Sequence, residues 1–535
     1  MSKMPHKMIA SDEKPLHLKK GKRIECNGER GTVLYVGEVP PTSGVWLGIE
    51  WDDPSRGKHD GLHEGDRYFQ TRHPTSGSFV RPLKVDFGRS FLSALKDRYR
   101  EIKGDDTYGV DPTKLSQLKR ELNVRFIEIV GLDQVNKIQS CLKDLQVAGL
   151  RDEKISKGDQ KGLISEECPA IQELDLSRNL LSDWITVAEI VAELPCLRVL
   201  NLSENLIQVP DDPESISHCF KSLEHMVLGK MEYSWDDVMT CIKMWPNIQE
   251  LQIPSNNISK LATPPLLHAL QSLDLQANPI GDWEEVNKLG ILPGLETLNV
   301  SEIGVKVIRF PEGHKTSLFP SLKRLIVQEN KIEEWVSISE LNKLTALQSL
   351  RILQNPVVDM FDTRTSRQLV IARIGSLTNL NGVEIQAMER KWSERDYIKQ
   401  AATIKLRMKI PDKDFIKIHP RYAELVEKHG EPEEGELVLS HTTSLSSTLI
   451  DLVICSPQRP GVKISKKLPK TMTVQRLKVL VNKILNFNDP RCLGLKLTNP
   501  KHPGMEINLD NDQKSLDYFS ADTGDVVVVQ QSTER

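Results

Sequence analysis

The residues best suited to hold a ligand lie in a short glycine-rich stretch, RGKHDGLHEGD at 56–66. Glycine permits tight turns and lets a ligand approach the backbone closely. Lys58 and His59 lie at the tip of such a turn, where a ligand could reach them. Aromatic residues are dense nearby, at Trp46, Trp51, Tyr68, Phe69 and Phe79. The stretch therefore predicts a binding site built from one loop and several rings.

A small β-structure must position this loop. Residues 21–88 are rich in glycine and β-forming residues with frequent turn signals, which is typical of a small β-barrel. Two short strands are expected around Asn27-Gly28, because that dipeptide favours a tight hairpin turn.

Several motifs of this segment together resemble the CAP-Gly domain family. The family carries a G-K-N-D-G loop, and the corresponding residues here are Gly57-Lys58-His59-Asp60-Gly61. The resemblance covers the whole module, assigned as 19–88, and includes Trp46-Leu47-Gly48, Tyr68-Phe69, Gly77-Ser78-Phe79 and Arg81-Pro82.

This resemblance implies a pocket for C-terminal acidic-aromatic tails of the Glu-Glu-Tyr/Phe kind. By the family's pattern the pocket would contain Trp46, Lys58, His59, Asp60 and Phe79. Lys58 would supply charge and backbone N–H groups of the loop would hold the terminal carboxylate. Trp46 and Phe79 would hold the last ring. His59 replaces the usual Asn, and its imidazole can donate one hydrogen bond with a different reach.

Some of these residues also have a purely structural interpretation. Trp51 and Phe69 are expected in the core of the module. Gly57, Asp60 and Gly61 could serve only to form the turn. Lys58 has no evident structural reason, which favours a role in binding.

The middle of the chain contains an internal repeat with a spacing of 22–27 residues, which is typical of leucine-rich repeats. Its clearest copies are LDLSRNLL at 174–181, LNLSENLI at 200–207, LQIPSNNI at 251–258, LDLQANPI at 273–280, LIVQENKI at 325–332 and LRILQNPV at 350–357. Two weaker copies, at 226–233 and 298–305, have Met231 and Ile303 where the others have Asn, so the hydrogen-bond ladder should weaken there. We assign the repeats to 142–370.

Each repeat predicts one short strand whose leucines point into the stack. The recurring Asn can bond the backbone of the neighbouring turn, and recurring tryptophans at 184, 235, 283 and 335 are expected to fill each coil. Because terminal repeats would expose apolar faces, caps are expected at both ends. We assign a linker and N-terminal cap to 89–141 and a C-terminal cap to 371–390.

Alternate strand residues should form the concave face of the solenoid. This face leans acidic at its start and basic at its end, with candidate contact residues Glu173, Asp175, Asp274, Arg324 and Arg351. We expect a protein-binding surface with a charge gradient; the alternative is a solvated surface without special meaning.

The C-terminal part divides into a charged helical linker, 391–447, and a module at 448–531. The order β-β-α-β-β, with Thr473 as helix N-cap, resembles a ubiquitin-like domain. The chain ends without Gly-Gly, so we expect a docking module rather than a conjugated modifier.

Composition limits the possible functions. Lys+Arg number 71 and Asp+Glu 74, and this balance argues against nucleic-acid or membrane-surface binding. The eight cysteines form no CxxC, which indicates reduced thiols and no metal site. No run is apolar enough for a signal peptide or membrane span. Phosphate-loop and nucleophile-elbow motifs are absent. We therefore expect a cytoplasmic, cytoskeleton-associated binding protein, not an enzyme, without catalytic residues or cofactors.

The predicted fold class is multidomain: a small β-barrel, an α/β leucine-rich-repeat solenoid and an α+β ubiquitin-like fold. This order resembles the tubulin-folding cofactor E family. The resemblance implies a chaperone that binds α-tubulin and, with other tubulin cofactors, assembles and dissociates the α/β-tubulin heterodimer. The ubiquitin-like end would dock another cofactor or the proteasome. The alternatives are a microtubule-associated CAP-Gly adaptor and a ubiquitin-pathway adaptor.

Overall fold

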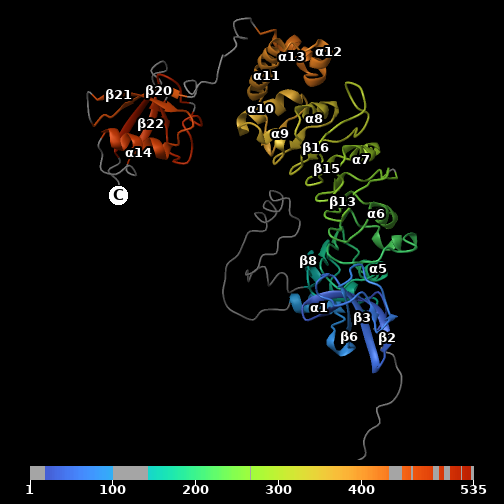
Figure 1. Cartoon of the computed structure of the whole chain (residues 1–535). Coiled ribbons are helices and arrows are strands. Elements are labelled where there is room, and N and C mark those ends of the chain that lie inside the picture. Colours follow the sequence, from blue (N-terminus) through green and yellow to red (C-terminus); the bar gives the residue numbers. More distant parts are fainter. Residues whose placement is uncertain are drawn as a thin grey trace, which may run out of the picture. The chain divides into compact units, whose positions relative to one another are not determined.

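The computed structural model describes residues 18–99, 142–265, 267–432, 449–458, 462–485, 493–498, 506–519 and 521–531. Contacts divide the chain into two compact units, 1–432 and 433–535 (Figure 1). The first unit contains the β-module, the repeats and a helical end.

The N-terminal module is an antiparallel four-stranded sheet in the order β1-β2-β3-β6. Its strands are β1 Arg23–Cys26, β2 Glu29–Val39, β3 Thr42–Trp51 and β6 Gly77–Val80, with a hairpin of β4 Leu62–His63 and β5 Asp66–Arg67 before β6. Asn27 and Gly28 both have positive φ, as a tight hairpin between β1 and β2 requires. The sheet covers a core that includes Ile24, Leu47 and Trp51, and the 3-10 helix η1 Pro82–Lys84 follows it.

The repeats form one eleven-stranded sheet in which neighbouring repeats pair in parallel. Its strands are β8 Val147–Gly149, β10 Glu173–Asp175, β11 Val199–Asn201, β12 His225–Val227, β13 Glu250–Gln252, β14 Ser272–Asp274, β15 Thr297–Asn299, β16 Arg324–Ile326, β17 Ser349–Arg351, β18 Asn379–Leu380 and β19 Val383–Glu384. Only β18–β19, at the end of this sheet, pairs antiparallel. The pairing continues without a register shift through β12 and β15, the strands of the two weak repeats.

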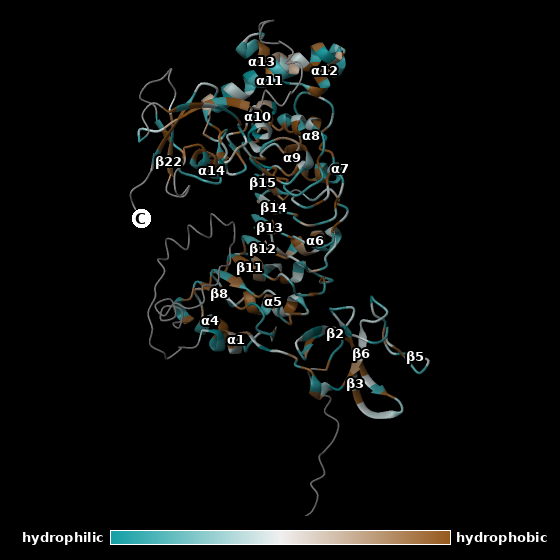
Figure 2. Cartoon of the chain, turned by 60° about the vertical axis from the view of Figure 1, so that its left-hand side comes forward, coloured by the Kyte–Doolittle hydropathy of each residue, from teal (hydrophilic) through white to brown (hydrophobic). Residues whose placement is uncertain are grey.

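Short helices return the chain on the side opposite the strands (Figures 1 and 2). They are α4 Leu163–Glu167, α5 Trp184–Val191, α6 Trp235–Cys241, α7 Trp283–Asn287, α8 Trp335–Glu340 and α9 Pro356–Asp359, with 3-10 turns η2 Leu142–Asp144, η3 Glu214–Phe220, η4 Ile242–Met244, η5 Lys288–Ile291 and η6 Leu341–Lys343. Four of them begin with a recurring tryptophan. Trp184, Trp235 and Trp283 are buried, whereas Trp335 is half-buried against Arg373 and Phe361.

A ladder of buried asparagines joins consecutive coils, as predicted. Asn278, for example, donates from Nδ2 to the carbonyls of Ile253 and Leu275 at 2.9 Å. Its Oδ1 accepts from the N–H groups of Asn256 at 2.9 Å and Ile258 at 3.1 Å. The backbone groups that leave each strand are thereby satisfied inside the stack.

The repeats are covered at both ends. At the first end, β7 Arg89–Ser90 pairs with β9 Ile155–Lys157, and α1 Phe91–Arg98 adds Phe91 and Leu95 to the core of the repeats. The remainder of the predicted N-terminal cap, 100–141, lies outside the described residues. At the other end, α10 Thr363–Arg373 precedes α11 Ala387–Met408, α12 Asp412–Ile418 and α13 Tyr422–His429.

The structure differs from the predicted charged linker over 391–432. Tyr397, Ile398 and Leu425 are buried against Leu369 and Ala372 in one cluster, so these helices belong to the first unit. Sequence patterning missed the packing because much of the buried face of α11 is small or polar, including Ser393, Ala401, Ala402 and Glu394.

Glu394 illustrates how this polar face is stabilised. Its carboxylate is 1% exposed and lies 2.8 Å from Lys428 Nζ, 2.7 Å from His429 Nε2 and 3.5 Å from Arg421 Nη2. A buried charge needs such partners to offset its desolvation. The remaining part of the predicted linker, 433–447, lies outside the described residues.

The second unit has the ubiquitin-like order of elements. Its sheet runs β21-β20-β24-β22-β23, with β20 and β24 parallel and the other neighbours antiparallel. The elements are β20 Leu449–Cys455, β21 Lys463–Pro469, α14 Val474–Leu485, β22 Leu493–Thr498, β23 Glu506–Asn508 and β24 Val526–Gln531. Val474, Leu477 and Val481 of α14 belong to the same core as the sheet. The multidomain fold class is confirmed.

Candidate functional site

The Lys58 loop lies along β6 and is fixed to it by backbone hydrogen bonds. The N–H groups of Lys58 and His59 donate to the Gly77 carbonyl at 2.7 and 3.2 Å, and the Gly77 N–H donates to the His59 carbonyl at 2.7 Å. The side chain of Lys58 is exposed. The loop therefore presents this cation to solvent on a well-fixed backbone.

Two glycines of the loop are required by space. A Cβ on Gly57 would lie 2.3 Å from the Thr75 carbonyl oxygen, and one on Gly61 would lie 2.1 Å from that of Phe69. Gly61 also has φ +96°, a conformation that side chains rarely adopt. These glycines form the turn, as the structural interpretation proposed, and thereby position Lys58 and His59.

The loop backbone has less free donor capacity than the sequence suggested. Besides Lys58 and His59, the Gly61 N–H donates to His59 Nδ1 at 3.0 Å and the Leu62 N–H to Asp60 Oδ1 at 3.2 Å. These four donors already have acceptors within the module. Fewer loop N–H groups are therefore available for a terminal carboxylate than the sequence suggested.

Phe79 is the centre of an aromatic cluster beside the loop. The ring centroid of His59 lies 5.1 Å away, and those of Phe69 and Tyr68 lie 5.4 Å away. His63 at 5.8 Å and Tyr35 at 6.3 Å complete it. Burial of Phe69 and Trp51 agrees with their predicted core role.

Sequence reasoning missed Tyr35 and His63. The strand register explains the place of Tyr35, because Gly48 pairs with Tyr35 on one side and with Phe79 on the other. A Cβ on Gly48 would lie 2.3 Å from the Phe69 ring. A glycine in the middle of a predicted strand is a signal of such close approach.

His59 has a defined tautomer and a lowered pKa. Because Nδ1 accepts the Gly61 N–H, the proton of the neutral ring is on Nε2. Burial lowers the pKa of His59, the neighbouring His63 lowers it further, and Asp60 opposes the shift. A neutral ring with an Nε2–H donor is therefore favoured near neutral pH.

Asp60 stabilises the turn of the Lys58 loop. Its Oδ2 accepts from Arg67 Nη2 at 2.8 Å, which joins the loop to the β4–β5 hairpin. This hydrogen bond, together with that from the Leu62 N–H, lowers the pKa of Asp60. Its carboxylate is thus committed to local structure and positions the loop.

Trp46 lies on β3 two residues before Gly48, which pairs with Tyr35 and Phe79 of the aromatic cluster. Residues two apart on a strand share a face, so Trp46 is on the same face as Gly48, which pairs with Phe79. The Trp46 Nε1 donates to Thr42 Oγ1 at 2.8 Å, and the Arg81 guanidinium lies 3.8 Å above its ring. The structure therefore brings His59 and Phe79 together, and it places Trp46, covered by Arg81, on the face of β3 that Gly48 shares.

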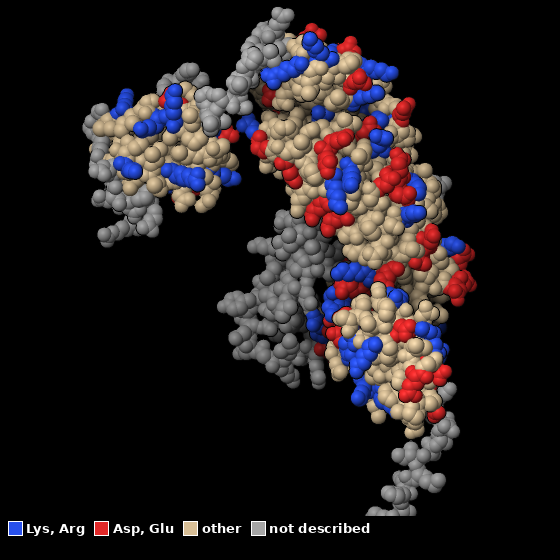
Figure 3. All heavy atoms as spheres, in the orientation of Figure 1, with Lys and Arg blue, Asp and Glu red and all other residues tan. Residues whose placement is uncertain are grey.

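The predicted concave residues occupy two rows on the strands. Glu173 and Arg324 are in the first position of their strands, while Asp175, Asp274 and Arg351 are in the third. Parallel pairing in constant register makes each position a continuous row along the sheet. All five residues thus share one face, and Figure 3 shows both signs of charge over the visible surface of the repeats.

The two aspartates of this set are less accessible than expected. Asp175 is buried and its Oδ1 accepts from the Ser177 N–H at 2.8 Å. Asp274 accepts from the Gln276 N–H at 2.8 Å and Asn299 Nδ2 at 2.9 Å, and burial raises its pKa. Arg324 and Arg351, in contrast, are exposed.

The middle of the concave face contains a polar group that sequence reasoning did not single out. His225 Nδ1 lies 3.2 Å from Glu250 Oε2, and Gln252 donates to Glu250 Oε1 at 2.6 Å. The first positions of β12 and β13 thus connect across the sheet, and Glu250 also bonds the third residue of its own strand. Among the described residues no group of His, Cys, Asp and Glu is arranged to hold a metal ion, and no helix is long and apolar enough to cross a membrane.

Comparisons with known proteins agree with this architecture. A family model described as CAP-Gly domain matches 20–85, and one described as leucine-rich repeat matches 281–410. Tubulin-specific chaperone E of Bos taurus is 40% identical over 523 residues, covering 95% of this chain and 98% of its own. The Mus musculus protein of that name is 41% identical over 522 residues, with the same coverage. The solution structure of the C-terminal ubiquitin-like domain of mouse tubulin-specific chaperone E is 31% identical, covering 18% of this chain and 98% of its own, with a TM-score of 0.16.

Proposed function

The chain belongs to the tubulin-specific chaperone E family, and we propose that it is a tubulin-folding cofactor whose CAP-Gly pocket captures the acidic-aromatic C-terminal tail of α-tubulin. The observation that carries this proposal is the exposed Lys58 on a fixed loop beside the aromatic cluster of Phe79. A cation next to rings suits a chain end that combines carboxylates with one aromatic side chain.

Each pocket residue has a role in this proposal. Lys58 attracts the carboxylates, and His59 donates from Nε2 to one of them. Phe79 and Trp46 contact the terminal ring of the tail from one face of the sheet. Asp60 acts indirectly, because its bond to Arg67 fixes the loop.

The solenoid supplies a second contact in this account. Its concave rows, with exposed Arg324 and Arg351 at one end, hold the folded body of tubulin or a partner cofactor. Two weak contacts on one chain strengthen each other through effective concentration. The chain then works with other tubulin cofactors to assemble and dissociate the α/β heterodimer, in the cytoplasm and at the cytoskeleton.

The ubiquitin-like unit is a further docking module in this proposal. Its partner is another tubulin cofactor or the proteasome. Binding assays of the full chain with each candidate distinguish these two, and the tail pocket plays no part in either contact.

Peptide binding tests the pocket assignment directly. The full chain is titrated with a peptide ending in Glu-Glu-Tyr, using wild type, Lys58→Glu and the matched control Lys84→Glu, an exposed lysine outside the loop. Charge reversal at Lys58 should weaken binding at least about tenfold, because an attraction becomes a repulsion. The control should bind like wild type. Retained binding by Lys58→Glu would overturn the assignment.

A further inference from the structure

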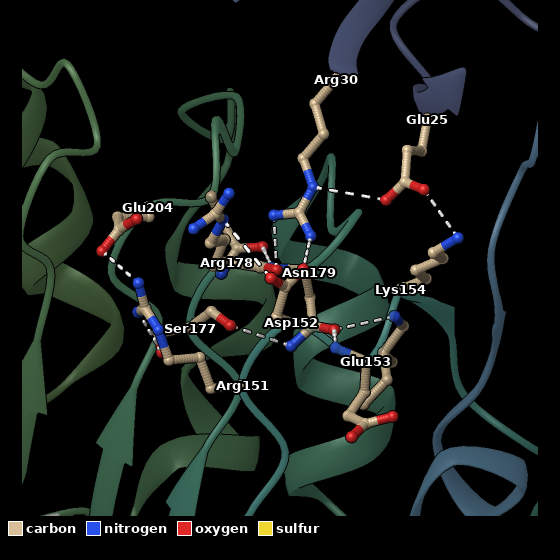
Figure 4. Close-up of polar contacts among 12 residues, drawn as sticks. Glu25, Arg30, Arg151, Asp152, Glu153, Lys154, Ser177, Arg178, Asn179 and Glu204 are labelled. Atoms are coloured by element: carbon tan, nitrogen blue, oxygen red, sulfur yellow. Dashed lines mark hydrogen bonds and ion pairs between the residues drawn. The ribbon is translucent and has the colours of Figure 1, made fainter. Parts of the chain in front are cut away.

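The CAP-Gly domain and the repeats have separate apolar cores, yet they touch through a cluster of charged residues. Ile24, Leu47 and Trp51 belong to one core, and Phe91 and Leu174 belong to the other. The contact centres on the loop 151–154, with the sequence RDEK, which connects β8 to β9. Figure 4 shows this loop facing Glu25 and Arg30 of the CAP-Gly domain.

The repeats hold this loop in a fixed conformation. Asp152 and Lys154 both have positive φ, at 64° and 56°, which is uncommon for residues other than glycine. Asn179 of the asparagine ladder stabilises it, because its Oδ1 accepts from the N–H groups of Glu153 at 3.1 Å and Ile155 at 2.9 Å. The loop geometry is thus set by the first repeats.

Three consecutive side chains of the loop contact the CAP-Gly domain or the strand that follows it. Asp152 pairs with Arg30, whose Nη1 also donates to the Arg178 carbonyl at 2.5 Å. Lys154 Nζ lies 2.6 Å from Glu25 Oε1 and 3.2 Å from Asp86 Oδ2.

Glu153 contacts Arg89 of β7, the strand that follows the CAP-Gly domain. The Arg89 guanidinium pairs with the Glu153 carboxylate, and its Nε donates to the Glu153 carbonyl at 2.8 Å. The Arg89 N–H donates to the Lys154 carbonyl at 2.9 Å. Two more ion pairs join CAP-Gly side chains to the repeats, Lys22 with Asp183 at 3.0 Å and Arg72 with Glu232.

The central pairs are shielded from water on the CAP-Gly side and open to it on the loop side. The Arg30 side chain is 9% exposed and that of Glu25 is 14% exposed, whereas Asp152 is 49% exposed and Lys154 is 39% exposed. Burial lowers the pKa of Arg30 and Asp152 opposes that shift, while hydrogen bonds to Glu25 and Asp86 raise the pKa of Lys154. Removing one partner would leave a partly buried charge uncompensated, which costs more than losing an exposed pair.

We infer that Asp152 and Lys154 form a docking latch that holds the CAP-Gly domain on the first repeats, while Glu153 fixes the connecting strand through Arg89. Resting on the proposed function, the latch keeps the tail pocket and the concave face in one geometry, so that a single tubulin molecule engages both. Pre-organisation of this kind increases affinity without adding a contact to the ligand. Because charges make the contact, the latch weakens as ionic strength rises.

Hydrogen exchange of the full chain tests the latch without any ligand. Arg30→Gln and Asp152→Asn each remove one charge of the central pair, and Arg151→Gln is the matched control. Arg151 is the next residue in the same loop but bonds Ser177 and Glu204 within the repeats. Exchange at 23–31 and 151–157 should rise at least about tenfold in the two latch variants and stay unchanged in the control. The segment 297–351 reports that the repeats remain folded. Unchanged exchange in both latch variants would overturn the latch.

The affinities of the latch variants for the tail peptide and for tubulin dimers then test whether the latch contributes to tubulin binding. The latch variants should bind the Glu-Glu-Tyr peptide like wild type but bind tubulin dimers at least about threefold more weakly, because only the dimer spans both contacts. Loosened exchange with unchanged dimer affinity would overturn the coupling. Failure of the wild type to bind the peptide would instead refute the proposed function, and the exchange result would still decide the latch.

Discussion

The imidazole of His59 lies beside the ring of Phe79, with centroids 5.1 Å apart and the planes tilted by 34°. The same imidazole accepts the Gly61 N–H through Nδ1. His59 therefore closes the loop through the hydrogen bond to its Nδ1 and packs against Phe79, the central ring of the cluster. Its Nε2 carries the N–H donor of the neutral ring. This is how a histidine takes the position where the CAP-Gly family usually has an asparagine.

Alanine substitutions at two glycines of the 56–66 stretch should distinguish the effect of a steric collision from the effect of backbone strain. Gly61 and Gly65 both have positive φ, at 96° and 92°, but only at Gly61 would a Cβ collide, 2.1 Å from the Phe69 carbonyl oxygen. Gly65→Ala should cost about 1 kcal/mol of domain stability and leave peptide binding intact. Gly61→Ala should distort the loop and abolish peptide binding. Titration with the Glu-Glu-Tyr peptide checks both, and equal behaviour of the two variants would contradict the steric argument.

The asparagine ladder should contribute strongly to the stability of the repeats. Asn278→Ala removes three donated and two accepted hydrogen bonds, and should cost about 3 kcal/mol or more. The control is Asn247→Ala, since Asn247 is exposed and donates one bond to the Lys221 carbonyl. Urea unfolding followed by tryptophan fluorescence measures the difference. A cost at Asn278 no larger than that at Asn247 would refute the ladder's role.

The charged residues on the concave strand rows should contribute to the binding of tubulin dimers but not to the binding of the tail peptide. Reversing the charges together in Glu173→Lys, Arg324→Glu and Arg351→Glu should weaken binding of tubulin dimers at least about fivefold, since complementary charges become repulsive. Asp175 is left unchanged because it is buried and holds a turn. Lys306→Glu, at an exposed position outside the strands, is the control. Titrations should show unaltered affinity for the tail peptide, and unchanged dimer affinity would remove the concave face from the account.

The helical end should lose stability in mild acid through His419. Burial, followed by the nearby Arg373, lowers the pKa of His419 to about 4, against roughly 6.5 in an unfolded chain. Between these values the unfolded state binds the proton and the folded state does not, so stability falls as pH falls. The loss should approach 2 kcal/mol at about pH 5 and end near the folded pKa.

Hydrogen exchange at 412–429, corrected for intrinsic rates, measures this loss. His419→Gln should remove most of the pH dependence, because glutamine does not titrate yet can bond Tyr397, whose hydroxyl lies 2.8 Å from His419 Nδ1. His218→Gln, at an exposed position in the repeats, should behave like wild type. An equal pH dependence in wild type and His419→Gln would show that another group is responsible.

The features that could be predicted from the sequence depend on residues at short or regular spacings. Leucines and Asn278 recur at repeat spacing, Asn27-Gly28 specifies a turn, and the apolar face of α14 repeats at helical spacing. Each depends on residues a few positions apart, so the strands, the ladder and the ubiquitin-like order could be foreseen.

The features that could not be predicted depend on contacts between distant residues. Glu394 is buried by partners on another helix, so α11 looked like a solvated linker. The Lys58 and His59 N–H groups are occupied by Gly77, a pairing that only the folded sheet reveals. The contact of Arg30 with Asp152 spans 122 residues and leaves no local pattern.

We propose that this chain captures tubulin through the α-tubulin tail. The most direct measurement is the affinity of the full chain for tubulin dimers whose α-tubulin C-terminal residues are intact or removed. We expect removal of the tail to weaken binding at least about tenfold. Lys58→Glu should reduce the affinity for intact dimers to the same level, without a further loss on tail removal. Equal affinity for intact and tailless dimers would contradict capture through the tail.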